Sequence, residues 1–197
     1  MKIVLATKNL HKIQEIRHAF SPFNIQLLSL NDFPDMPDVL EDGQTLEENS
    51  LKKAKEIHHF TGLTALADDT GLEVDALNGA PGVFSARYAG EENNYEANNQ
   101  KLLFELKNTT TEQRIARFRC VMTLFGNNIL EIAEGILAGQ IIEENRGNNG
   151  FGYDPVFVPQ GYDKTLAELS LDEKNSISHR GLAVQKMVGI IKKLSDK

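Results

Sequence analysis

Apolar runs of strand length alternate with segments of helical periodicity, and this alternation restricts the fold more than any other feature of the chain. Residues 2–6 form a short, largely apolar run typical of a buried strand, and apolar residues then recur at helical spacing at Ile13, Ile16 and Phe20. The same patterns predict strands over 64–67, 116–124, 129–142 and 155–158, and helices over 45–60, 94–107 and from 182 onward. Mixed elements of this kind indicate an α/β fold with a twisted sheet.

Helix boundaries are marked by local signals. Thr45 and Glu48 have the spacing of a capping box, and Gly62 lies just past the end of the helix that they begin. Ser170 and Glu173 repeat the capping-box spacing, so a further short helix is expected there. In the strand over 129–142, Gly135 and Gly139 are expected to produce bends.

Length and charge limit the class of protein. At 197 residues the chain fits one large domain or two closely joined lobes, and its 41% hydrophobic content is enough for a real core. The net charge of −7 argues against a nucleic-acid partner, which needs rows of Lys and Arg, but not against one small phosphate ligand. A single cysteine, Cys120, and the lack of a signal-peptide or membrane-spanning segment predict a soluble, cytoplasmic protein with no membrane partner.

Two adjacent aspartates, Asp68 and Asp69, follow the predicted strand over 64–67, and Thr70-Gly71 comes next. Asp and Gly are common turn residues, so a plain turn explains the pair when it is taken alone. The alternative is that the strand ends at Asp69 in order to place a carboxylate rigidly in a site. The other polar clusters of the chain decide between these interpretations.

A first cluster, Thr7 to Lys12, lies between the first predicted strand and the first helix. Such a junction offers free backbone N–H groups and the positive end of a helix dipole, which attract phosphate. Thr7 and Asn9 are candidates to donate hydrogen bonds and Lys12 to neutralise charge, although the glycines of a Walker A loop are missing. A simple helix cap by Thr or Asn is the alternative.

A second cluster consists of Glu41 with Asn49, Lys52 and Lys53 on the following helix, where Asn49 and Lys53 share a face. A solvated helix surface explains these residues equally well. A third cluster is the glycine-rich segment 147–157, in which Phe151 offers a ring that can stack on a flat base; aromatics that fill the core are the alternative.

A fourth cluster gathers Lys174, Ser178, His179 and Arg180 between two helical stretches, either as anion and base contacts or as a polar turn between helices. Each cluster, taken alone, is explained equally well by its structural alternative. Together the four clusters supply carboxylates, cations, an aromatic platform and a phosphate-ready helix start, the components of a site for a nucleoside triphosphate and a divalent metal.

The sequence resembles the inosine triphosphate pyrophosphatase family over nearly its whole length. The resemblance rests on five ordered motifs: LATKNLHK, TLEENSLKKA, ADDTGLEVDALNGAPGVFSARYAG, GFGYDPVF and EKNSISHRG. Lys8 stands where many members have a small residue, and Thr70 stands where Ser is common. The resemblance implies a single domain over 1–197 with an elongated, two-lobed α/β fold, a long mixed twisted sheet, a cleft between the lobes and, commonly, a homodimer.

The resemblance also implies an activity: Mg²⁺-dependent hydrolysis of deaminated purine nucleoside triphosphates (ITP, dITP and XTP) to monophosphate and pyrophosphate, which keeps them out of DNA and RNA. Glu41 and Asp69 match the family's magnesium-binding carboxylates, and Asp69 also matches its proposed general base. The phosphate-binding loop matches Thr7, Lys8, Asn9, Leu10, His11 and Lys12. A substrate contact matches Thr70, and the nucleotide pocket matches Phe151, Gly152, Tyr153, Asp154, Lys174, His179 and Arg180.

Base choice follows from hydrogen-bond chemistry. Hypoxanthine and xanthine carry a carbonyl at purine position six, which His179, Arg180 or backbone N–H groups are expected to meet, whereas adenine presents a donor there. The alternatives are a pyrophosphatase that prefers pyrimidine or modified nucleotides, a nucleotide sensor without turnover, and a nucleic-acid-binding module. The acidic charge disfavours the last, and Glu41 with Asp69 disfavours the sensor.

Overall fold

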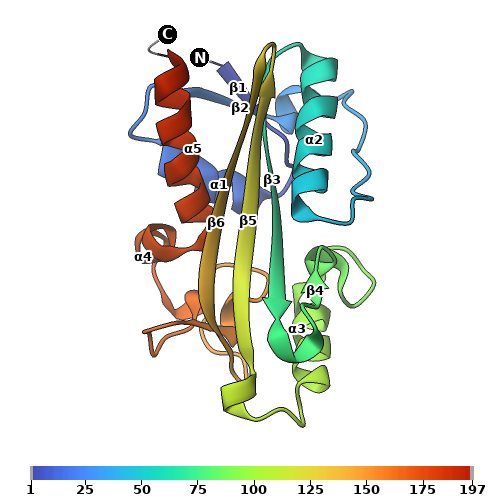
Figure 1. The fold of residues 1–197 in the computed structure, drawn as a ribbon, viewed down its shortest axis with the longest axis vertical. Coiled ribbons are helices and arrows are strands. Elements are labelled where there is room, and N and C mark those ends of the chain that lie inside the picture. Colours follow the sequence, from blue (N-terminus) through green and yellow to red (C-terminus); the bar gives the residue numbers. More distant parts are fainter. Residues whose placement is uncertain (1, 196–197) are drawn as a thin grey trace. The chain divides into compact units, whose positions relative to one another are not determined.

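In the computed structural model, which describes residues 2–195, helices flank a mixed β-sheet (Figure 1). The strand order is β2-β1-β3-β5-β6-β7, with β4 paired to β3. β1 runs parallel to β2 and β3, whereas β4 is antiparallel to β3 and β7 is antiparallel to β6. The prediction of an α/β fold is therefore confirmed. The strands are β1 (Lys2–Leu5), β2 (Gln26–Ser29), β3 (Thr64–Val74), β4 (Pro81–Gly82), β5 (Ile115–Gly126), β6 (Ile129–Ile141) and β7 (Phe157–Pro159).

Five α-helices are described, and most of the predicted boundaries hold. They are α1 (Leu10–Phe20), α2 (Leu46–Thr61), α3 (Tyr95–Glu105), α4 (Leu171–Ile177) and α5 (His179–Ser195). Thr45 caps α2 by accepting a hydrogen bond from the Glu48 backbone N–H, and Gly62 ends it in the left-handed conformation. Ser170 and Glu173 form the complete capping box expected at the start of α4.

The chain divides into two compact units. Unit 1 contains Met1–Asp69, Cys120–Gly135 and Arg180–Lys197, and unit 2 contains Thr70–Arg119 and Ile136–His179. The strands β3, β5 and β6 each contribute residues to both units. No helix within the described part of the chain is both long enough and apolar enough to cross a membrane.

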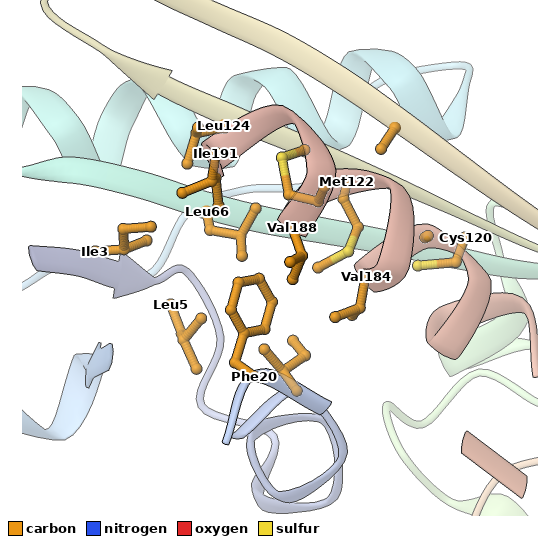
Figure 2. Packing of buried hydrophobic residues seen from close by; sticks show 14 of the residues in the cluster. Ile3, Leu5, Phe20, Leu66, Cys120, Met122, Leu124, Val184, Val188 and Ile191 are labelled. Carbon is orange, nitrogen blue, oxygen red and sulfur yellow. The ribbon is translucent and has the colours of Figure 1, made fainter. Parts of the chain in front are cut away.

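Unit 1 has an apolar core on each side of β1. Ile3 and Leu5 pack with Phe20 of α1 and with Val184 and Val188 of α5 (Figure 2). Val4, which points the other way, packs in a second cluster with Ala54 and Ile57 of α2. Because β1 is buried on both faces, its sequence is continuously apolar after Lys2 instead of alternating.

Unit 2 has a core of its own, built where α3 packs with the ends of the long strands. Leu72 of β3, Leu102 of α3 and Phe157 of β7 belong to this cluster, and the Phe118 and Phe157 ring centroids lie 4.7 Å apart. Gly139 in β6 has a packing reason, because a Cβ there would lie 2.3 Å from the Val158 carbonyl oxygen. β6 runs unbroken over Ile129–Ile141, and the glycine at 139 permits a close approach of β7.

Two predicted boundaries were wrong. β3 does not end at Asp69 but continues to Val74, so the aspartates and Thr70-Gly71 lie inside a strand. Tertiary contacts of the two carboxylates override the turn preference of these residues. The second error concerns the fourth cluster: Lys174 lies within α4 and α5 already begins at His179, so the polar residues are helical and only Ser178 separates the two helices.

Candidate active site

The two neighbouring aspartates of β3 point to opposite faces of the sheet, as successive residues of a strand must. Both are buried, with Asp68 2% and Asp69 7% exposed. A buried carboxylate is tolerated only when cations or hydrogen-bond donors surround it. Each of the two therefore defines a separate cluster of charges in unit 1.

The Asp68 cluster consists of one carboxylate between two cations. Its Oδ2 lies 3.1 Å from Lys12 Nζ and 3.4 Å from Arg180 Nε. Arg180 also donates from Nη1 to Glu15 of α1, a second buried carboxylate. Although burial opposes ionisation, Lys12 and Arg180 hold the pKa of Asp68 well below its ordinary value, so it is ionised throughout the neutral range.

The Asp69 cluster faces α2. Asp69 Oδ1 lies 3.3 Å from Lys53 Nζ, and Oδ2 accepts a hydrogen bond from Asn49 Nδ2 at 3.2 Å. Lys53 Nζ also lies 3.2 Å from Glu41 Oε2 and donates to the Asp68 backbone oxygen at 2.7 Å. Burial raises the pKa of Asp69 above the ordinary aspartate value, with Lys53 opposing the shift and Glu41 adding to it.

The pKa values of the two adjacent aspartates shift in opposite directions, so the two carboxylates differ in how readily they take up a proton. Asp68 is locked as a charged anchor for Lys12 and Arg180, whereas Asp69 holds a proton more readily than an ordinary aspartate. A carboxylate with a raised pKa in a buried cluster is suited to accept a proton from water.

Glu41 and Asp69 were the predicted metal ligands, and the structure brings them together. Among residues 2–195, no group of three or more His, Cys, Asp or Glu side chains is arranged to hold a metal ion. The pair nevertheless converges on one point, since Lys53 Nζ lies within 3.3 Å of an oxygen of each. Mg²⁺ commonly takes one or two protein carboxylates and completes its octahedron with water and phosphate oxygens, so these residues fit that ion.

The predicted phosphate loop, Thr7 to Lys12, forms the start of α1. Asn9 is the N-cap, and its Oδ1 accepts from the backbone N–H groups of His11 at 3.0 Å and Lys12 at 3.3 Å. Thr7 Oγ1 accepts from Asn9 N, so both side chains act here as acceptors, as the helix-cap alternative requires. Lys8 pairs with Asp38 at the surface, and the side chain of Leu10 is exposed.

In unit 2, the aromatic loop is held by a buried ion pair. Asp154 Oδ2 accepts from Lys174 Nζ at 2.7 Å and from the Phe151 backbone N–H at 2.8 Å. Lys174 Nζ lies 4.9 Å from the Phe151 ring centroid. The left-handed Gly150 is required by close approach, because a Cβ would lie 2.2 Å from Asp154 Oδ2. The structure thus gathers four of the predicted pocket residues, Phe151, Gly152, Asp154 and Lys174, in one region.

Other predicted pocket residues have structural partners. Tyr153 is buried and donates its hydroxyl to the Ser85 carbonyl oxygen at 2.9 Å, which agrees with the core-filling alternative for this aromatic. His179 is buried and stacks on Phe118, with ring centroids 4.5 Å apart and planes 14° from parallel. Thr70, half-buried in β3, is the first residue of unit 2.

Arg180 follows His179 in the sequence, and its side chain is fixed between Asp68 and Glu15 of unit 1. The reason is charge: a buried guanidinium requires carboxylates, and unit 1 supplies two.

Of the residues in these clusters, the sequence analysis missed Glu15; it named Asn49 and Lys53 as a candidate cluster with Glu41, with a solvated helix surface as the alternative. Asn49 and Lys53 carried a signal, since they share the α2 face that also contains the buried Leu46 and Ile57. A polar residue at a buried helical position needs a partner, and the partner here is Asp69. Glu15 carried a weaker signal, a lone acidic residue next to the buried Ile16.

Comparisons with known proteins agree over the whole chain. The Ham1 family model matches residues 3–190. A dITP/XTP pyrophosphatase of Desulforamulus reducens is 49% identical over 195 residues, which cover 98% of this chain and 97% of that protein. A dITP/XTP pyrophosphatase of Clostridium perfringens is 50% identical over 195 residues, with 94% and 95% covered.

Solved structures show the same fold. The Staphylococcus aureus Ham1 protein superposes with a TM-score of 0.87 at 40% identity and covers 98% of this chain and 99% of its own. A HAM1 protein from Coxiella burnetii gives a TM-score of 0.89 at 41% identity with the same coverage.

Proposed function

This chain belongs to the Ham1 family, and we propose that it hydrolyses the deaminated purine nucleoside triphosphates dITP, XTP and ITP to monophosphate and pyrophosphate. Full-length relatives that are about half identical are dITP/XTP pyrophosphatases. The observation that carries the proposal is the pair Glu41 and Asp69 converging on Lys53, with Lys12 and Asp68 on the other face of the same strand. Carboxylates and cations in this arrangement suit a phosphate ester that binds with a divalent ion.

Asp69 is the proposed general base. Its raised pKa favours acceptance of a proton from the attacking water, and Asn49 and Lys53 each engage one of its oxygens. Water adds across the bond between the α- and β-phosphates, and pyrophosphate leaves without a covalent enzyme intermediate. Glu41 and Asp69 would hold Mg²⁺, which would supply charge that offsets the phosphates and would help to activate the water.

Lys12 and Lys53 are the proposed cationic phosphate contacts. Both are held by carboxylates in the structure, so each ammonium is already positioned before a phosphate arrives. Together with the α1 N-terminus, they make unit 1 the proposed triphosphate site. Thr7, Lys8, Asn9, Leu10 and His11 complete the proposed loop.

The base is proposed to bind to unit 2, where Phe151 offers its ring and where Lys174, Asp154 and Gly152 fix the loop. Thr70 is a further proposed substrate contact, and Tyr153, His179 and Arg180 are the remaining proposed residues of the nucleotide pocket. A two-lobed domain with the nucleotide in a cleft, which the family resemblance implies, is part of the proposal. A magnesium-dependent homodimer in the cytoplasm completes the proposal.

The proposed activity is tested by measuring pyrophosphate release from a panel of nucleoside triphosphates. With Mg²⁺ present, kcat/KM for ITP, dITP and XTP should exceed that for ATP and GTP at least about a hundredfold. A site that hydrogen-bonds the six-carbonyl rejects the amino donor of adenine at that position, and a pocket with no acceptor near position two leaves the two-amino donor of guanine unpaired. The Asp69→Asn variant is the background control. Comparable hydrolysis of ATP or GTP, or preference for a pyrimidine triphosphate, would contradict the proposal.

A further inference from the structure

The side chain of Asn49 connects the Asp69 carboxylate to the backbone segment that follows Glu41, through opposite ends of one amide. Its Nδ2 donates to Asp69 Oδ2 at 3.2 Å, and its Oδ1 accepts from the Gly43 backbone N–H at 2.8 Å. Gly43 lies two residues beyond Glu41. The residue is 1% exposed, so both hydrogen bonds are made away from solvent.

Gly43 is shaped for this contact. A Cβ at that position would lie 2.7 Å from Asn49 Oδ1 and 2.9 Å from Glu48 Cβ, so any side chain would push the segment away from α2. The segment is also fastened by Gln44 N donating to Glu48 Oε2 at 2.7 Å. The backbone that carries Glu41 is therefore held against α2 through the same side chain that orients Asp69.

The asparagine amide has both the donor and the acceptor that this bridge requires. Aspartate keeps an acceptor for Gly43 but loses the donor and faces Asp69 with a like charge. Leucine, of similar size, has neither group. We propose that Asn49 is a positioning residue for hydrolysis, because it holds the Asp69 carboxylate and the Glu41 segment in one fixed arrangement around Lys53.

The inference rests on the proposed function and concerns the same site. A purely structural role for Asn49 is the alternative, and the neighbouring Ser50 offers a matched comparison. Ser50 is also fully buried on α2, and its hydroxyl hydrogen-bonds to the Ala67 carbonyl oxygen at 3.3 Å and to Thr123 Oγ1 at 2.8 Å. Ser50→Ala therefore removes buried hydrogen bonds of the same helix without touching Asp69 or Gly43.

The experiment compares Asn49→Leu, Asn49→Asp and Ser50→Ala by ITP kinetics and by hydrogen–deuterium exchange of the peptide that contains Gly43. In Asn49→Leu, kcat should fall roughly 10- to 150-fold, the equivalent of one lost hydrogen bond to a charged group, with KM changed less than about threefold. Exchange in the peptide should quicken about 2- to 12-fold, as expected for one lost neutral hydrogen bond.

Asn49→Asp separates the two ends of the bridge. It should lose kcat at least as strongly as Asn49→Leu while keeping wild-type exchange at Gly43, because the acceptor remains. Ser50→Ala should keep both kcat and exchange near wild type. A wild-type kcat in Asn49→Leu, or an equal kcat loss in Ser50→Ala, would overturn the inference. If the wild-type protein releases no pyrophosphate from any triphosphate, the proposed function itself fails, whereas unchanged exchange in Asn49→Leu would still refute the Gly43 contact.

Discussion

Replacing Asp68 with Asn should cost the protein more stability than replacing Asp69 with Asn. In Asp68→Asn, Lys12 and Arg180 lose the carboxylate that lies 3.1 and 3.4 Å from them. Breaking a buried ion pair by removing one partner costs about 3–5 kcal/mol. Arg180 keeps Glu15 and the Lys12 side chain is 17% exposed, so a loss near the lower end, about 3 kcal/mol, is expected.

Asp69→Asn should behave differently because burial already disfavours the charge of this residue. Its raised pKa means that ionisation costs the folded state free energy as pH rises above the ordinary aspartate value. Removing the charge relieves that cost but also takes a carboxylate from the buried Lys53 ammonium, which keeps Glu41, so the free energy of unfolding at pH 7 should fall less than in Asp68→Asn. The kcat should nevertheless fall at least about a hundredfold, the low end for loss of a general base.

Urea unfolding in EDTA, followed at several pH values, measures both effects. The depressed pKa of Asp68 means that its stabilisation is fully present above pH 3.8 and is lost only as pH falls through the folded-state pKa. The gap between wild type and Asp68→Asn should thus be constant from pH 7 to 5 and narrow in stronger acid. Asp38→Asn, which removes an exposed partner of Lys8, is the control and should match wild type. Equal stability of wild type and Asp68→Asn at pH 7 would refute the reasoning.

Three further predictions concern the loops and the cations. Lys12→Ala should weaken ITP binding roughly 10- to 150-fold, because the lysine is placed for the outgoing phosphates. Binding of the monophosphate product, measured by product inhibition, should weaken less. Equal weakening of both nucleotides would mean that Lys12 serves only as the partner of Asp68. Gly150→Ala should destabilise the protein more than Gly152→Ala in urea unfolding, since both have positive φ but only the first Cβ would collide, at 2.2 Å from Asp154 Oδ2. Glu15→Gln should lower the free energy of unfolding by about 3 kcal/mol, because the buried Arg180 guanidinium loses one of its two carboxylate partners. The KM for ITP should stay near the wild-type value.

Local signals predicted much of the fold. The caps at Thr45 and Ser170 act within a few residues, so their sequence spacing was sufficient to place the starts of α2 and α4. The apolar run of β1 and the alternation in β5 likewise follow the burial of successive residues along each strand, so they can be recognised within the strand's own sequence.

Contacts between distant segments were the part that the sequence could not provide. Asp68, Asp69 and Thr70 look like turn residues, and only the cations of α1, α2 and α5 allow a strand to continue through them. In the same way, nothing local shows that Arg180 faces Glu15, which lies 165 residues away. The family resemblance supplied the candidate residues of the site, and the structure added the partners of Asp69, Lys12, Lys174 and Arg180.

The interleaving of the two units has a consequence during protein synthesis. Ile3 and Phe20 emerge early from the ribosome, but Val184 and Val188, which cover them, come after the whole of unit 2. At about 5–20 residues per second, the ribosome needs roughly 6–22 s to translate from Asp69 to Arg180. Throughout that interval the nascent chain therefore holds the apolar faces of β1 and α1 without the α5 residues that cover them, and such transiently exposed surface favours aggregation.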